Sequence, residues 1–271
     1  MPDIDNFRRS TSVFREYEER CLHINIHRTN DMSLVFKPNN DGTLLTTLQD
    51  LVLDTYDASN ILVFVPTRED GLNSTQRRFL NKLKLVLLNN SPEISEPSDG
   101  ERFIDDLVSF LCIQANLDEG LELSMRPCLL RLIIGEETFT ANTNKEGRRR
   151  GRELIWLLQE DKHRNSTTYK HGDLQLACSM IAAIQRNYIH YDTIKPRKLL
   201  GMKIAADKFY FYSMEATEEY INELFGGLPQ QQQHIVIHRY PENGLSLADP
   251  TERKEILKYL SLLYREALSM D

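Results

Sequence analysis

An acidic and a basic side chain, Glu160 and Lys162, stand two residues apart at the end of an apolar run. That run, from Leu154 to Leu158, is typical of a buried strand. Because side chains alternate between the faces of a strand, Glu160 and Lys162 are expected on one face and Asp161 on the other. A carboxylate placed there can hold Mg²⁺ or Mn²⁺, and a neighbouring ammonium group can orient an attacking water or stabilise charge on a phosphate. The pair is therefore a candidate centre for metal-dependent hydrolysis of a phosphodiester.

The elements that would position this pair are predicted from hydrophobic periodicity. A helix begins near Ser98, because Ser98 and Glu101 form a capping box ahead of an apolar stripe. The elements expected after it are strands over 121–125, 129–141 and 153–162, a helix over 173–188, a hairpin of 199–204 with 209–213, a helix over 217–225, a strand over 235–238 and a helix over 249–268. The sequence thus predicts an α/β (α+β) fold with a mixed central sheet flanked by helices.

The order helix, strand, strand, strand ending in Glu-x-Lys, then helix resembles the α-β-β-β-α core of the PD-(D/E)XK (restriction-endonuclease-like) nucleases. The resemblance covers about residues 98–188. It implies a Mg²⁺- or Mn²⁺-dependent nuclease in which Glu160 binds the metal ion and Lys162 assists the nucleophile. It also implies a catalytic place for Gln175, since many members carry a glutamine that faces the site from the following helix.

The same resemblance implies a second metal ligand, an aspartate at the end of a strand upstream of Glu-x-Lys. Asparagines stand at this point, Asn142 and Asn144. An amide oxygen can ligate a metal ion but brings no negative charge, so affinity for a hard cation is expected to fall. Asn142 or Asn144 would complete the catalytic site, with Asn144 as the metal ligand beside Glu160, and Glu137 and Glu146 are alternative acids.

A glycine-containing basic turn is expected over residues 145–152, just before the strand that carries Glu160. Its arginines are expected to contact the phosphates of a nucleic acid: Arg148, Arg149, Arg150 and Arg152. The same run is also typical of a solvated turn or a weak nuclear-import signal.

Composition sets the class of protein. The chain has 271 residues, a formal net charge of -7 and 41% hydrophobic residues, which is typical of a globular protein. The net charge disfavours a protein that coats nucleic acid by bulk electrostatics, but it permits local binding. Neither a membrane span nor a signal peptide is expected, and four widely spaced cysteines are expected to be reduced. These features predict an intracellular protein of the nucleus or cytoplasm, with no membrane partner.

The N-terminal region has its own pattern of strands over 21–27, 33–36 and 61–65 and a helix over 44–52. This order is β-grasp-like, and a domain boundary is expected within the proline-containing segment 89–100. The chain is thus divided into an N-terminal α/β region over 1–92, which is either a separate module or part of the same domain, and a nuclease-like domain over 93–271. A β-grasp-like module joined to a nuclease-like domain resembles the layout of Crinkler-type effectors of fungi and oomycetes.

Two functions from different classes follow. The first is a metal-dependent nuclease that acts on DNA or RNA. The second is a catalytically inactive protein of the same fold that binds nucleic acid or protein, in keeping with the missing aspartate. No GxGxxG, GxxxxGK[ST], GxSxG or HExxH motif occurs, so dinucleotide-binding, P-loop, esterase and zincin functions have no motif support.

Overall fold

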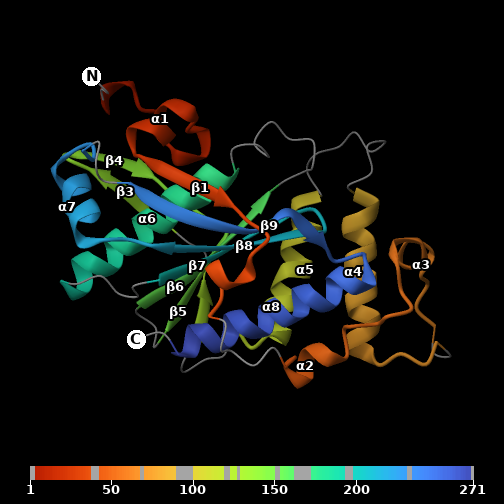
Figure 1. Ribbon diagram of the computed structural model, residues 1–271. Helices are drawn as coiled ribbons and strands as arrows, with labels where there is room; N and C mark the ends of the chain where they lie inside the picture. Colours follow the sequence, from red (N-terminus) through yellow and green to blue (C-terminus); the bar gives the residue numbers. More distant parts are fainter. Residues whose placement is uncertain are drawn as a thin grey trace.

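The computed structural model describes residues 4–37, 43–67, 70–89, 100–118, 123–126, 129–149, 153–161, 172–192, 198–230 and 234–269. These residues form a seven-stranded mixed sheet with helices against both faces (Figure 1), which confirms the predicted α/β class. The strands are β1 (Ile24–Arg28), β2 (Leu123–Arg126), β3 (Arg131–Ile134), β4 (Glu137–Thr140), β5 (Lys145–Arg149), β6 (Glu153–Asp161), β7 (Lys198–Ala205), β8 (Lys208–Glu215) and β9 (Ile235–Ser246).

The order of strands in the main sheet is β1-β9-β8-β7-β6-β5-β2, and β3 and β4 form a separate antiparallel pair. β1 pairs with β9 in parallel, β6 pairs with β7 in parallel, and β8 is antiparallel to both of its neighbours. β1, β9, β7 and β6 therefore run in one direction, and their carboxyl ends lie along one edge of the sheet.

The helices form two layers. The α-helices are α1 (Glu16–Cys21), α2 (Thr46–Gln49), α3 (Ala58–Val63), α4 (Ser74–Asn89), α5 (Gly100–Gln114), α6 (Gly172–Tyr191), α7 (Glu218–Gly226) and α8 (Pro250–Ser269), and the 3-10 turns are Ile4–Asn6, Thr11–Val13 and Met32–Leu34. On one side of the sheet α5 and α8 pack against the strands, with α4 on α5, α3 on α4 and α2 beside α8, and on the other side lie α1, α6, α7 and the β3–β4 pair (Figure 1).

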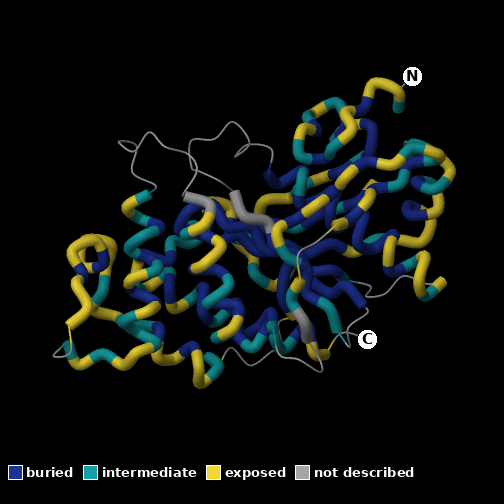
Figure 2. The backbone as a smooth tube through the Cα atoms, turned by 180° about the vertical axis from the view of Figure 1, so that it is seen from behind, coloured by how far each residue is buried: buried dark blue, intermediate teal, exposed yellow. Residues whose placement is uncertain are grey.

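Each layer encloses its own hydrophobic core, and the central strands contribute to both cores (Figure 2). In β7, Leu200, Met202 and Ile204 face α8 and α5, whereas Leu199 and Ala205 belong to the α6 core. This alternation is the two-residue period of a strand covered on both faces. Among the described residues no helix is long and apolar enough to cross a membrane. Three of the four cysteines, Cys21, Cys112 and Cys178, are free and buried, and Cys128 lies outside the described residues.

Two of the three N-terminal strand predictions are wrong. Residues 33–36 are largely a 3-10 turn and its end, in which the Asp31 carboxylate accepts a hydrogen bond of 2.9 Å from the Ser33 N–H. Residues 61–65 begin inside α3, because Ile61 and Phe64 share the helical face toward the core, whereas Val63 between them is 76% exposed. The β-grasp-like pattern depended on both strands. The remaining strand, β1, joins the main sheet beside β9.

Two predictions in the second half are also wrong. The single strand expected over 129–141 is the β3–β4 hairpin, whose turn uses the positive φ of 58° at Gly135. The basic turn expected over 145–152 contains strand β5, which pairs with both β2 and β6. A Cβ atom on Gly147 would lie 1.9 Å from Nε1 of Trp156, so this glycine lets the indole lie against the strand. Most of the expected boundary segment, residues 90–99 with Ser98 of the capping box, lies outside the described residues.

Candidate functional site

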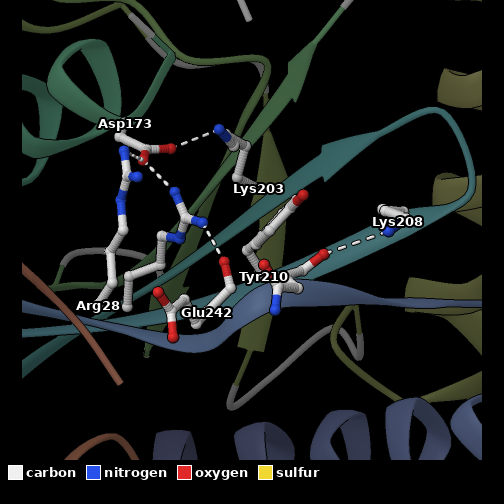
Figure 3. A pocket seen from close by; sticks show the side chains of 8 residues that line it. Arg28, Asp173, Lys203, Lys208, Tyr210 and Glu242 are labelled. Carbon is white, nitrogen blue, oxygen red and sulfur yellow. Dashed lines mark hydrogen bonds and ion pairs between the residues drawn. The ribbon is translucent and has the colours of Figure 1, made fainter. Parts of the chain in front are cut away.

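A cationic pocket opens at the carboxyl edge of the sheet, beside the first turn of α6 (Figure 3). The end of β1, β7 and the later part of β9 supply side chains to it, and the β7–β8 hairpin closes one wall. The pocket has a volume of about 670 Å³, and its lining is Arg28, Asp173, Lys203, Lys208, Tyr210, Arg239, Glu242 and Asn243. The carboxyl ends of parallel strands are the usual place for a ligand in an open α/β sheet.

Asp173 is the centre of the pocket's charge network. Its carboxylate pairs with Lys203 and with Arg239, and Nη2 of Arg28 lies 3.6 Å from Oδ2. Figure 3 shows Arg28 and Lys203 directed toward this carboxylate from different sides. The side chains of Asp173 and Lys203 are only 6% and 2% exposed. A charged pair this deep is stable only when its partners and hydrogen bonds are complete.

The protonation states follow from these contacts. Burial alone would raise the pKa of Asp173, but the cations of Lys203 and Arg239 outweigh it and hold that pKa below its usual value. Burial, reinforced by the charge of Asp173, raises the pKa of Tyr212 well above its usual value, so its hydroxyl stays protonated and donates to Asp173 at 2.8 Å. Asp173 also lies in the first turn of α6, where the helix dipole favours a negative charge.

Tyr210 forms part of the pocket wall, and its ring contacts two of the pocket's cations. The guanidinium of Arg239 lies 4.8 Å from the centre of its ring, and Nζ of Lys203 lies 5.1 Å from it. These are cation–π distances. Gly244 makes room for the ring, because a Cβ atom there would lie 2.6 Å from Tyr210 Cζ. Lys208 donates a hydrogen bond of 3.3 Å to the Asn243 carbonyl at the rim.

The lining carries an excess of positive charge. Among the described residues of the lining, four cationic side chains, Arg28, Lys203, Lys208 and Arg239, face two carboxylates, Asp173 and Glu242, which leaves two positive charges. On a chain with a net charge of -7, such an excess is a local exception. A cavity with this balance beside a helix N-terminus is suited to an anionic ligand.

The residues predicted around the Glu-x-Lys pair converge only in part. Asn144 precedes β5, and its N–H donates a hydrogen bond of 3.0 Å to the Leu158 carbonyl, two residues before Glu160. From α6, Nε2 of Gln175 donates to the Asn142 carbonyl at 3.3 Å. The Asn142 side-chain oxygen accepts from the Leu130 N–H at 3.1 Å. Asn144 therefore lies beside the end of β6, and Gln175 contacts Asn142, two residues before Asn144 in the chain.

The structure describes Glu160 only through its backbone, and it does not describe Lys162. Glu160 lies in β6, where its backbone pairs with Ile204, and its side chain is outside the described part of the chain. Lys162 also lies outside the described residues. Within the described residues no group of three His, Cys, Asp or Glu side chains is arranged to hold a metal ion. The amides of Asn142 and Asn144 alone do not make a site for Mg²⁺ or Mn²⁺, which need carboxylate charge.

The predicted nucleic-acid-binding arginines that are described are paired within the sheet. Arg148 forms an ion pair with Glu146 on the same strand, and Nη2 of Arg149 lies 2.7 Å from a carboxylate oxygen of Glu153. Arg150 and Arg152 lie outside the described residues. Of the two alternative acids, Glu146 is thus engaged with Arg148. The other, Glu137, is bound to Arg9 at 2.8 Å.

Sequence reasoning missed the residues that form the pocket. Lys203 stands inside the apolar run of β7, and Arg239 stands two residues after the apolar start of β9. A charged residue within a buried strand needs a partner of opposite charge, and this signal was present in the sequence. The partner, Asp173, is marked in the sequence only as the first residue of the expected helix over 173–188.

No protein-family model and no curated protein matches this chain.

Proposed function

We propose that this chain binds a nucleic acid through its phosphate groups, and that the cationic pocket is the binding site. The observation that carries the proposal is the excess of two positive charges in an open cavity of about 670 Å³ beside the N-terminus of α6. Phosphate is the common anionic group whose charge and oxygen geometry match guanidinium and ammonium donors. This proposal corresponds to the non-catalytic alternative of the sequence analysis.

Charge elsewhere on the chain supports a local mode of binding. Because the net charge is -7, a nucleic acid laid across the surface would meet repulsion as well as attraction. A single pocket would engage few phosphates, so the affinity is expected to fall only gently as salt is raised.

The test is fluorescence anisotropy with labelled single-stranded DNA, single-stranded RNA and duplex DNA, in EDTA. Arg28→Ala and Lys208→Ala remove cations from the exposed side of the pocket, and each is expected to raise Kd about tenfold, the cost of a charge-assisted hydrogen bond. Lys254→Ala, which removes an exposed cation from α8, is the matched control and is expected to leave Kd unchanged. Binding that is absent, or equally weakened by all three variants, contradicts the proposal.

A second candidate is the metal-dependent nuclease. It is favoured by the position of Asn144, whose N–H is bonded to the Leu158 carbonyl near the end of β6, and by the contact of Gln175 with the Asn142 carbonyl. It is tested by incubating the same nucleic acids with Mg²⁺, Mn²⁺ or EDTA, with Glu160→Ala and Lys162→Ala alongside. Metal-dependent cleavage that is lost in both variants supports a nuclease. Binding without cleavage in any metal supports the binding function alone.

A further inference from the structure

The cations of the pocket lie at very different depths. At its base, the side chains of Lys203 and Arg239 are 2% and 9% exposed. Near the opening, the side chain of Arg28 is 56% exposed. A ligand that contacts both the exposed and the buried cations must therefore place an anionic group deep in the pocket, beyond Arg28 and close to Arg239.

Arg239 retains donors for such a group. Its Nη1 pairs with Asp173 and its Nη2 donates to the Glu242 carbonyl, and each of these nitrogens carries a further hydrogen. Its Nε is buried and has no hydrogen-bond partner within the described residues. The guanidinium is held in place by these contacts, so little side-chain entropy remains to be lost on binding.

The depth of the innermost cations favours one of two kinds of phosphate. An internal phosphodiester carries one negative charge and is flanked by a sugar on each side, which holds it at the surface of a strand. A terminal phosphomonoester is attached through one sugar only, can enter a pocket, and carries a charge of about -1.5 to -2 at pH 7. The second charge matches the excess of two positive charges in the lining.

We infer that the pocket receives the terminal phosphate of a nucleic-acid strand in preference to an internal phosphodiester. This inference rests on the proposed function, because it specifies which phosphate of the nucleic acid enters the pocket. The charge and depth of the pocket do not distinguish a 5′ from a 3′ phosphate, so both ends belong to the test.

The experiment compares three single-stranded oligonucleotides of one sequence, with a 5′ phosphate, with a 3′ phosphate and with hydroxyls at both ends. Each carries its fluorophore on an internal base, so both ends are free. At least one phosphorylated form is expected to bind at least about tenfold more tightly than the unphosphorylated form, the effect of one or two charge-assisted contacts. Lys208→Ala and Arg28→Ala are expected to abolish this difference, and Lys254→Ala to retain it.

The outcomes separate the two proposals. Equal binding of all three oligonucleotides, weakened by Arg28→Ala, overturns the terminal-phosphate inference and leaves the proposed function standing. No binding of any oligonucleotide overturns both. Thermal melting of each variant shows that it is folded, and excess inorganic phosphate, which fills the same pocket, is expected to remove the advantage of the phosphorylated form.

Discussion

The hydroxyl of Tyr212 on β8 donates a hydrogen bond of 2.8 Å to Oδ1 of Asp173 on α6, and both side chains are buried. This bond joins the sheet to the helix that packs against it. It completes the set of donors around a carboxylate that also holds Lys203 and Arg239. The stability of the pocket therefore depends on a charge that is removed from water.

Asp173→Asn is expected to lower the free energy of unfolding by about 3 to 5 kcal/mol, because it leaves two buried cations without their counter-ion. Tyr212→Phe removes one donor and keeps the ring, so a loss of about 1 to 2 kcal/mol is expected. Urea unfolding followed by circular dichroism measures both. A smaller loss for Asp173→Asn than for Tyr212→Phe would contradict this account of the network.

The acid dependence of stability has a definite sign. The pKa of Asp173 is lower in the folded protein than in the unfolded chain, so its contribution is present at neutral pH and is lost as pH falls through the folded pKa. The difference in unfolding free energy between wild type and Asp173→Asn is expected to be constant above about pH 5 and to shrink below about pH 4, the ordinary range of an aspartate. A difference that grows on acidification would contradict the prediction.

The two opposite charges near the pocket opening are expected to act in opposite directions on nucleic-acid binding. Glu242→Gln removes an exposed carboxylate and is expected to lower Kd, whereas Lys208→Gln is expected to raise it. The slope of log Kd against log salt should become shallower by about 0.7 for Lys208→Gln if this lysine contacts one phosphate of a single strand. An unchanged slope would show that Lys208 does not contact the ligand.

Gly147→Ala is expected to destabilise the protein by about 1 to 3 kcal/mol, because its Cβ atom would overlap the buried indole of Trp156. Gly226→Ala is the matched control, since no atom lies within 4 Å of its added Cβ. Thermal melting compares the two. A loss of stability for Gly226→Ala equal to that for Gly147→Ala would mean that the contact with Trp156 has no special role.

Leu260→Asp is expected to cost at least about 3 kcal/mol, because it places a carboxylate where a fully buried side chain stands on α8. Lys254→Asp introduces the same side chain at an exposed position of the same helix and is expected to change stability little. Chemical denaturation measures both. A loss below about 1 kcal/mol for Leu260→Asp would mean that this face of α8 is not packed on the sheet.

Long periodic segments were predictable from the sequence. Helix α8 has Ile256, Leu260 and Leu263 on one buried face, as its spacing indicates. The structure of short apolar runs was not predictable from the sequence, since residues 61–65 fit a strand by composition. Residues 61–63 instead form the last turn of helix α3, and Ile61 and the Phe64 that follows the helix both reach the core. Strand β5 has a basic, glycine-containing sequence, and its strand state comes from pairing with β2 and β6.

The cationic pocket could not be predicted from the sequence, because it too depends on tertiary structure. Lys203 and Arg239 are each visible as a charge near an apolar strand, but the partner that they share is set by sheet order and by the position of α6. Asn144 is nearer to its expected place, because the residue that precedes β5 is brought beside β6 by the pairing of the two strands.

The parallel pairing of β1 with β9 has a consequence for the time at which the protein becomes competent to bind. His27 and His238, partners in that pairing, are 211 residues apart in sequence, so Arg28 and Arg239 become neighbours only through a long-range closure. Such closures are slow and come after local structure has formed. A growing chain on the ribosome would carry Arg28 early and yet have no pocket. An anion that spans both arginines would favour the paired arrangement of β1 and β9 by mass action, so ligand binding reports that synthesis has passed β9 and that β1 has paired with it.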